Sequence, residues 1–435
     1  DVLPVSSLQL GFLVNTLKDP SAYMVQIAYG MAGPLDVGRL HQSWQRTAAD
    51  HAILRTKFVV ADGFSAHSFL QVTLDQCDME WTYHDQKGAD VSTLETAHFS
   101  SDRQRGFDFT GPLLRLALVR VDTDQHILFF TFHHALLDAW SVELILADTL
   151  SHYHAVRCRP PTQFHDFIAQ LTTDNLEQAE RFWRSTLAGV KVTPAIQFPS
   201  PPTAQDTELT HHTHFHPLDP PLAEIQHYCH RQGVTVNTLL LALWALTLGR
   251  YAQVSDEVTF GTLVSGRSVA VPGIESMAGL CINTIPFRAH LPAEGTLSDF
   301  VREIGQHFLA LSDYEQASLV DIQRWANLPA DAPLFDTLLV YDNFQKAEAA
   351  TKDGLKYIPR SGQNFTEYAY TAHFSHDHDR LNLRLTVQGV HSDTVYVGYM
   401  AQFINHCLVE LIQGRAVAFA DVLRLPLREH EQIQR

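Results

Sequence analysis

Two adjacent histidines and an aspartate four residues beyond the second, His133, His134 and Asp138, are the residues best suited to chemistry in this chain. A histidine ring can be neutral near pH 7, so His134 could accept or pass on a proton during a reaction. Asp138 could hold a loop by accepting hydrogen bonds from backbone amides, or it could pair with an arginine from elsewhere. The pattern alone is common, and two buried structural histidines would also produce it.

The residues around this motif predict a strand before it and a helix after it. Ile127–Phe132 is a short apolar run typical of a buried strand, and Leu113–Val119 is a second such run with a turn signal between them. We expect these two strands to pair antiparallel at the centre of a sheet. Beyond the motif, apolar residues recur at helical spacing, with Ser141 as the expected N-cap. His134 would then lie where a strand ends, which is where scaffolds often present reactive groups.

Strand-like and helix-like segments alternate along the rest of the chain, which predicts an α/β fold. The further elements that we expect are a helix between Asp36 and Asp50, a strand over Ile53–Val60, a helix over Asn175–Leu187, a strand over His212–His216, a helix over Val236–Tyr251 and a strand over Asp256–Leu263.

The length of 435 residues exceeds that of one ordinary core, so we expect two lobes. The composition loosens between about residues 157 and 203, where prolines gather. We therefore predict a first lobe over residues 1–172 that carries the histidine motif, a linking segment over 173–204 and a second lobe over 205–435.

The composition restricts partners and location. A charge of −17 repels phosphate backbones, so we expect no nucleic-acid partner. Five scattered cysteines without a C-x-x-C pair favour a reducing compartment. The N-terminal residues do not resemble a signal peptide, and the longest apolar run, Thr238–Leu248, is about half of a bilayer span. We expect a cytoplasmic protein with no membrane partner.

No pattern predicts a bound cofactor or a metal ion. P-loop and G-x-G-x-x-G motifs are absent, and the segment Ser265-Gly266-Arg267 lacks the flanking glycines of a nucleophile elbow. His212, His214 and His216 would share one face of a strand, where we expect an exposed histidine-rich edge rather than a metal site.

The segment Phe132–Ser141 resembles the H-H-x-x-x-D-G signature of condensation domains, which belong to nonribosomal peptide synthetases, with fungal enzymes the expected source. Seven other segments resemble motifs of the same family in the same order, and together they extend over residues 1–344. They are Pro4–Gly11, Asp50–Phe58, Phe107–Arg115, Phe260–Arg267, Pro272–Gly279, Cys281–Pro286 and Leu334–Leu338.

This resemblance implies two lobes that each resemble chloramphenicol acetyltransferase, in a V-shaped pseudo-dimer with a tunnel between them. Carrier proteins would bind on opposite faces and extend phosphopantetheine arms towards the histidines, while the chain itself binds no cofactor. His134 is implied to be the catalytic or positioning residue, and Asp138 to be mainly structural with Arg267 as its partner across the lobes. The other implied residues are His133, Ala139 and Ser141 in support of the motif, and Trp140, Ser265, Gly266, Cys281 and Asn283 near the tunnel.

The chain departs from the family pattern at a few positions. Ala139 replaces the glycine after the aspartate, which keeps an amide able to support an oxyanion but makes any positive φ costly. Asp50 stands where the family usually has arginine, which could alter an outer salt bridge. Leu280 and Cys281 occupy positions often filled by bulkier or aromatic residues. Our hypothesis is that these changes alter the tunnel and select an unusual donor or acceptor.

The expected function is acyl transfer that forms an amide bond between a carrier-bound acyl or peptidyl thioester and an amine, with His134 as base or positioning group. The alternatives are terminal cyclisation with release of the peptide, epimerisation, and an inactive domain that only docks partners. An acyltransferase that uses coenzyme A is disfavoured, because the D-F-G-W-G element is missing. Ala139 suits cyclisation, whereas His133 and a tail, Leu427–Arg435, typical of a run-out towards a following domain favour elongation.

Overall fold

The computed structural model describes residues 1–32, 35–60, 69–76, 79–171, 176–194, 196, 211–328, 333–343, 354–363, 368–376, 379–388, 394–415 and 417–422. The chain forms two compact units. The first consists of Asp1–Asp174, Ser265–Ile282 and Phe344–Thr366, and the second of Asn175–Val264, Asn283–Asn343 and Glu367–Arg435. The predicted division into residues 1–172, 173–204 and 205–435 is therefore wrong in two respects. Two segments of the predicted second lobe belong to the first unit, and the predicted linking segment belongs from Asn175 onwards to the second unit. The predicted tail, Leu427–Arg435, lies outside the described residues.

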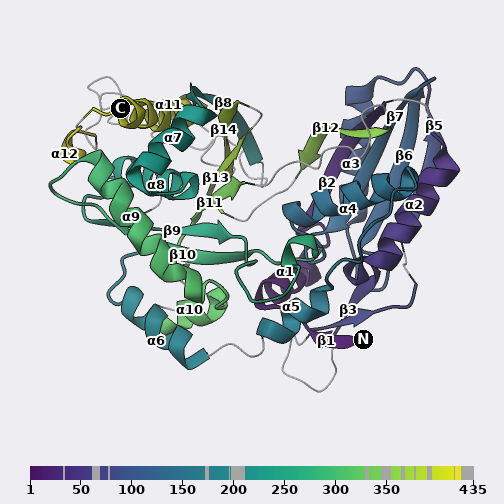
Figure 1. The fold of residues 1–435 in the computed structure, drawn as a ribbon, viewed down its shortest axis with the longest axis horizontal. Helices are drawn as coiled ribbons and strands as arrows, with labels where there is room; N and C mark the ends of the chain where they lie inside the picture. The colour runs from purple at the N-terminus through teal and green to yellow at the C-terminus, as the bar shows by residue number, and fades with distance from the viewer. Residues whose placement is uncertain are drawn as a thin grey trace. The chain divides into compact units, whose positions relative to one another are not determined.

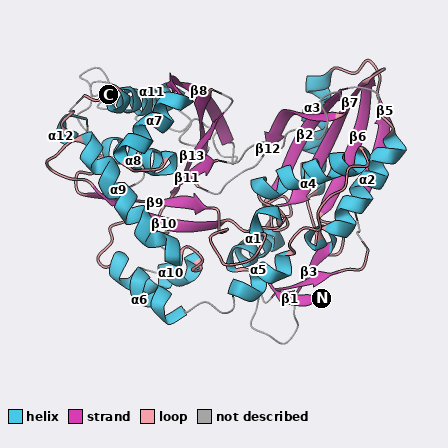
Figure 2. Ribbon diagram, viewed as in Figure 1, coloured by secondary structure: helices cyan, strands magenta, loops and turns pink. Residues whose placement is uncertain are grey.

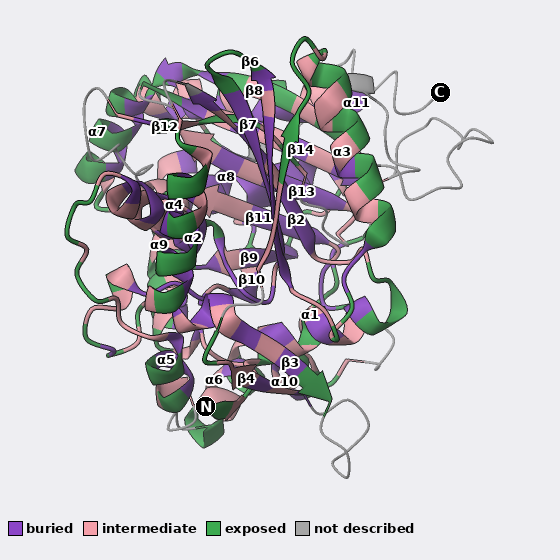
Figure 3. Ribbon diagram, turned by 90° about the vertical axis from the view of Figure 1, so that its right-hand side faces the viewer, coloured by how far each residue is buried: buried purple, intermediate pink, exposed green. Residues whose placement is uncertain are grey.

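The first unit is built on a five-stranded sheet with the order β12-β2-β7-β6-β5 (Figure 1). Its strands are β2 (Met24–Ala32), β5 (Glu80–Asp85), β6 (Leu114–Asp122), β7 (Gln125–His133) and β12 (Lys356–Gln363). The predicted antiparallel pair is confirmed, because β6 and β7 are antiparallel neighbours and β7 is the middle strand. Figure 3 shows both strands as buried.

Helices cover both faces of this sheet, which is why every residue of β7 after Gln125 is buried. Leu128 and Phe130 face α2 (Val37–Asp50) and α4 (Ala139–Tyr153), where Trp44 lies edge-on to Phe130 at 5.3 Å between ring centroids. Phe129, between them in sequence, packs on the other face against α3 (Val91–Arg105). Burial of each such side chain contributes about 1.5–3 kcal/mol, so β7 is held firmly where it delivers the histidines.

A small three-stranded sheet of the first unit has the order β1-β4-β3, with β1 (Val2–Pro4), β3 (Thr56–Val60) and β4 (Phe69–Thr73). The other elements of this unit are α1 (Ser7–Lys18), η1 (Ala52–Arg55), α5 (Phe164–Leu171) and η2 (Ile274–Ser276). The predicted strand over Ile53–Val60 is wrong in its first half, where a 3₁₀ turn replaces it. Long-range contacts stabilise this turn: Gln163 accepts a hydrogen bond from the Ala52 amide, and the Arg55 guanidinium donates to the Leu74 carbonyl. A local apolar pattern cannot reveal such contacts.

The second unit holds a six-stranded mixed sheet with the order β10-β9-β11-β13-β14-β8 and its own covering helices (Figure 2). Its strands are β8 (His211–Pro221), β9 (Glu257–Val264), β10 (Asn283–His290), β11 (Thr337–Asp342), β13 (Tyr370–His376) and β14 (Arg380–Gln388). Its helices are α6 (Leu176–Thr186), α7 (Leu222–Gln232), α8 (Val236–Tyr251), α9 (Leu297–Leu311), η3 (Ser312–Tyr314), α10 (Leu319–Trp325), α11 (Thr394–Ile412) and α12 (Phe419–Val422).

Both units combine mixed sheets with helices, so the predicted α/β class is confirmed. The predicted helix over Val236–Tyr251 has the bounds of α8, which is buried from Thr238 onwards and forms the centre of the second core. Within the described part of the chain, no helix alone has the length and apolar character to cross a membrane. The joined α7 and α8 meet these criteria only as a pair bent by 94°.

Candidate active site

The histidine motif forms a tight connection between β7 and α4. His133 is the last residue of β7, His134–Leu136 form a turn, and α4 begins at Ala139. The N-cap of α4 is Asp138 rather than the predicted Ser141. Asp138 has extended backbone angles, and its carboxylate accepts a hydrogen bond of 2.8 Å from the Ser141 amide. Asp138 directly precedes the helix, and its side chain accepts a hydrogen bond from the third helical amide, that of Ser141. It therefore provides the cap that was expected from the Ser141 side chain.

His133 is fully buried and has a structural role. Its Nε2 lies 2.8 Å from the hydroxyl of Thr16, and its Nδ1 accepts a hydrogen bond of 3.1 Å from the Ala135 amide. Burial lowers the pKa of His133 to about 3, and the adjacent His134 acts in the same direction. A neutral ring that is bonded at both nitrogens within the protein is not available for proton transfer to a substrate.

His134 differs from its neighbour in all these respects. Its amide donates to the Tyr23 carbonyl at 2.8 Å, which fixes the backbone, whereas its Nδ1 is buried and has no hydrogen-bond partner among the described residues. The residue is partly exposed and its ring lies 5.3 Å from that of Phe12. Burial lowers the pKa of His134, partly offset by backbone groups of His134 and Leu137 and by the Asp138 carboxylate. His134 is thus neutral near pH 7 and able to accept a proton.

The Asp138 carboxylate has no capacity left for proton transfer. It accepts hydrogen bonds from the Ser141 hydroxyl at 2.6 Å and from the Cys281 amide at 3.1 Å, besides the bond from the Ser141 amide. Nη2 of Arg267 lies 3.3 Å from each carboxylate oxygen, and both side chains are almost completely buried. The predicted pair forms, but within the first unit rather than across the lobes, because Ser265–Ile282 belongs to that unit.

Arg267 also organises the segment that carries it. Its Nη1 donates to the carbonyls of Ile274 at 2.8 Å and Met277 at 2.9 Å, and its guanidinium lies over the ring of Trp140 at 5.4 Å. The Trp140 indole in turn donates to the Glu275 carbonyl at 3.0 Å. Trp140, predicted to lie near the substrate, is therefore engaged in holding this segment against the start of α4.

Ser141 and Gly279 make the closest contact between the two segments. The Ser141 hydroxyl accepts a hydrogen bond from the Gly279 amide at 2.9 Å and lies 2.8 Å from the Gly279 carbonyl. A Cβ atom at Gly279 would come within 2.0 Å of the Phe164 ring, so only glycine fits this approach. Ser141 supports the motif as predicted, through its hydroxyl rather than as a cap.

Ala139 causes no backbone strain. It is the first residue of α4, and it is not among the described residues that have positive φ. The expected cost of replacing glycine therefore does not arise at this position. No hydrogen bond among the described residues uses the Ala139 amide, as is common for the first amide of a helix.

The other predicted tunnel residues lie in different settings. The Ser265 hydroxyl accepts from the Arg267 amide at 3.4 Å, and Gly266 has a φ of 64°, so both shape the turn before Arg267. Cys281 is buried, and burial followed by the Asp138 charge raises the pKa of its thiol. Asn283 belongs to the second unit, where its amide donates to the carbonyls of Glu315 and Ala317 at 2.7 and 2.9 Å.

Two residues of α1 that were not predicted to have a role contact the motif. Nε2 of Gln9 donates to the Ala135 carbonyl at 3.0 Å, and Thr16 bonds His133 as described above. Both polar side chains are buried. They are seven residues apart, which places them on one face of a helix, and polar residues at that spacing among apolar neighbours are a signal that could have indicated them.

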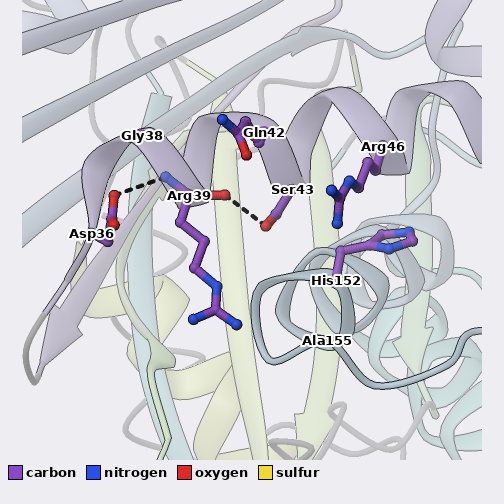
Figure 4. A pocket seen from close by; sticks show the side chains of 8 residues that line it. All are labelled: Asp36, Gly38, Arg39, Gln42, Ser43, Arg46, His152 and Ala155. Carbon is purple, nitrogen blue, oxygen red and sulfur yellow. Dashed lines mark hydrogen bonds between the residues drawn. The ribbon is translucent and has the colours of Figure 1, made fainter.

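Asp50, the unusual acid at the end of α2, pairs with His152 on α4 at 2.8 Å. The same helices bound a groove of about 400 Å³, lined by Asp36, Gly38, Arg39, Gln42, Ser43, Arg46, His152 and Ala155 (Figure 4). None of these residues belongs to the histidine motif. Among the described residues, no group of three or more His, Cys, Asp and Glu side chains could hold a metal ion.

Comparisons with known proteins agree on one family. The family model described as a condensation domain matches residues 1–433. A linear gramicidin synthase of Brevibacillus parabrevis is 31% identical over 386 residues, which cover 85% of this chain and 8% of that protein. Chondramide synthase cmdD of Chondromyces crocatus is 34% identical over 333 residues, with 74% and 8% covered. The chain thus spans about 8% of the length of these two curated relatives.

A solved structure shows the same fold. The condensation domain from Monacolin K polyketide synthase MokA matches with a TM-score of 0.82 and 18% sequence identity, over 96% of this chain and 99% of that one. At this identity the match concerns the fold alone.

Proposed function

Because the chain belongs to the condensation-domain family, we propose that it forms an amide bond between a carrier-bound acyl or peptidyl thioester and an amine carried by a second carrier protein. In this proposal the carriers bring their substrates on phosphopantetheine arms, the chain binds no cofactor of its own, and neighbouring synthetase domains supply the carriers. A cytoplasmic setting suits it, since the described cysteines, Cys158, Cys229, Cys281 and Cys407, are all free thiols.

The observation that carries the proposal is the contrast between the two histidines. His133 is bonded at both ring nitrogens, whereas His134 is partly exposed and neutral, and its buried Nδ1 has no partner among the described residues, so in this proposal Nε2 is the atom that meets the amine. A neutral imidazole at the end of a rigid strand, with its backbone fixed by Tyr23, is suited to orient or receive the proton of an attacking amine.

The reaction conserves atoms and charge without a further reactant. The amine nitrogen attacks the thioester carbonyl and forms the C–N bond, and its proton moves to the neutral ring of His134. The C–S bond then breaks, and the departing sulfur receives that proton as a thiol. Holding both reactants in place provides much of the acceleration, because effective molarities of roughly 10⁵ M or more are reached in favourable cases.

Asp138 and Arg267 have a supporting part in this proposal. Their buried pair fixes the start of α4 and thereby the turn that carries His134. Ala139 is compatible with an amide that supports the developing oxyanion, because it begins the helix without strain. Ala139 still suits a ring-closing domain, since such domains tolerate departures around the motif, whereas the retained His133 favours elongation, which is our first choice with cyclisation the second.

A product assay tests the proposal. A peptidyl thioester is loaded on one carrier, an aminoacyl thioester on a second, and products are identified by mass spectrometry with wild-type protein, His134→Ala and His165→Ala. His165 is a half-exposed histidine on α5 outside the motif, so its replacement controls for the loss of an imidazole. We expect product with the wild type and the control, and at least about a hundredfold less with His134→Ala, because a positioned general base typically contributes about 10²- to 10⁴-fold.

The outcomes separate the alternatives. Product that requires the second carrier supports elongation. A cyclic product from the peptidyl carrier alone would make this a terminal ring-closing domain, and exchange of the α-proton without a new bond would make it an epimerase. Near-normal turnover by His134→Ala would overturn the role of His134, and binding of carriers without any product would favour an inactive docking domain.

A further inference from the structure

Helix α1 directs one of its faces at the histidine turn. Gln9, Phe12 and Thr16 have the spacing i, i+3 and i+7, which aligns them along one side of a helix. Gln9 bonds the Ala135 carbonyl, the Phe12 ring lies beside that of His134, and Thr16 bonds His133. One helix thus contacts the strand end and the turn through three different side chains.

The hydrogen bonds around His133 determine which ring nitrogen carries the proton. The Ala135 amide can only donate, so Nδ1 of His133 must be the acceptor. In a neutral ring the proton then resides on Nε2, which donates to the Thr16 hydroxyl at 2.8 Å. The Thr16 hydroxyl sends its own proton to the carbonyl of Phe12 at 2.9 Å or of Ala22 at 3.3 Å, and so keeps a lone pair for His133.

We infer that Thr16 is a positioning residue for the reaction, which fixes the turn carrying His134 by setting the tautomer of His133. The inference rests on the function proposed for His134. Thr16 touches neither His134 nor a substrate in this scheme, and it acts only through the bonds from His133 to Ala135.

Without the Thr16 hydroxyl, both tautomers of the neutral His133 ring are unfavourable. With the proton on Nε2, a buried donor has no partner. With the proton on Nδ1, that N–H faces the N–H of Ala135 and the bond between them is lost. Either choice weakens the turn just before His134, and displacement of a reacting group by about 1 Å can reduce a rate by up to about 100-fold.

Three substitutions test this chain of bonds. Thr16→Val removes the acceptor with little change in shape, and Thr16→Ser retains it. Thr47→Val is the matched control: Thr47 is equally buried in the first unit, and its hydroxyl bonds Thr149 and the Ser43 carbonyl at 3.0 Å each, away from both histidines. We measure kcat and KM in the two-carrier assay, together with hydrogen–deuterium exchange of the peptide that contains residues 133–137.

We expect Thr16→Val to lower kcat by about 10- to 100-fold with KM within about twofold of the wild type. Exchange of the peptide that contains residues 133–137 should become at least about tenfold faster, because the turn opens more often. Thr16→Ser should restore most of kcat, and Thr47→Val should change neither quantity. In a His133→Ala background, Thr16→Val should reduce kcat by less than twofold further, because residues that act through one another give non-additive effects.

Unchanged kcat and exchange in Thr16→Val would overturn the inference, as would multiplicative losses with His133→Ala or a failure of serine to rescue. The exchange measurement does not need turnover. If the wild type makes no product, the proposed function fails. Faster exchange in Thr16→Val than in Thr47→Val would still support the role of Thr16 in fixing the His133 tautomer and the turn, and equal exchange would overturn that role.

Discussion

Two residues of the same type, adjacent in the chain, acquire opposite properties at the end of β7. His133 is buried in the core and bonded at both ring nitrogens, so its role is to hold the strand end against Thr16 and Ala135. His134 begins the turn, where side chains are no longer enclosed on all sides, and it retains an unbonded nitrogen among the described residues. The identity of a residue sets which chemistry is possible, and its hydrogen bonds decide whether that chemistry is available.

The pH dependence of the reaction should report His134. Its ring must be neutral to receive a proton, and burial lowers its pKa below the ordinary 6.5. The active neutral form therefore predominates at pH 7 and is lost as pH falls through the lowered pKa. We expect the acidic limb of kcat/KM to lie below pH 6.5 in a pH–rate profile, and an acidic limb above that value would contradict a lowered pKa of His134.

At the scale of elements, the start of α4 has a double function. Asp138 caps the helix and also binds Arg267 and the Cys281 amide, so one carboxylate joins the helix to the Ser265–Ile282 segment. Gly279 allows the close approach of that segment, because any side chain there would collide with Phe164. The turn that carries His134 is thus held from the α1 side by Gln9 and Thr16 and from the α4 side by Asp138.

Asp138→Ala should destabilise the protein much more than the loss of an ordinary helix cap. It leaves Arg267 buried without its charge partner, for which about 3–5 kcal/mol is typical. Asp90→Ala is the matched control. Asp90 caps α3, which like α4 is 15 residues long, but it does so from an exposed position, and no arginine binds it among the described residues. Urea denaturation should give the larger loss for Asp138→Ala, and equal losses would mean that the Arg267 pair contributes nothing beyond the cap.

At the scale of the molecule, the first unit is completed by segments that come late in the chain. Ser265–Ile282 supplies Arg267 to the histidine motif, and Phe344–Thr366 supplies β12, which pairs antiparallel with β2. Glu95 on α3 secures that added strand by bonding Arg360 and Ser361. The unit that contains His134 is therefore not a contiguous piece of sequence.

A fragment that ends at residue 174 should fail to fold stably. It would expose the edge of β2 and bury Asp138 without Arg267, two defects that favour aggregation and destabilise the core. We expect poor solubility and little dispersion in the amide NMR spectrum of the fragment, compared with the full chain. A soluble fragment with a cooperative unfolding transition would show that the late segments are dispensable for the first unit.

The sequence by itself determined the elements whose pattern is local. Helical spacing predicted α2, continuous apolar runs predicted β6, β7 and α8, and the alternation of strand-like and helix-like segments predicted the α/β class, because burial of one face or of a whole element marks neighbouring residues. Motif order indicated the family and selected His134, since those residue types recur at fixed spacing.

Only the tertiary structure decided the points that depend on contacts between distant residues. It made Asp138 rather than Ser141 the cap, because two nearby polar side chains compete for one helix end and the distant Arg267 and Cys281 favour the aspartate. It brought Ser265–Ile282 and β12 into the first unit, and it enlisted Gln9 and Thr16 from α1. The seven-residue spacing of Gln9 and Thr16 marks one face of a helix, but it does not say which residues that face bonds. Partners more than a hundred positions apart, such as Ala135 and His133, become visible only when the chain is folded.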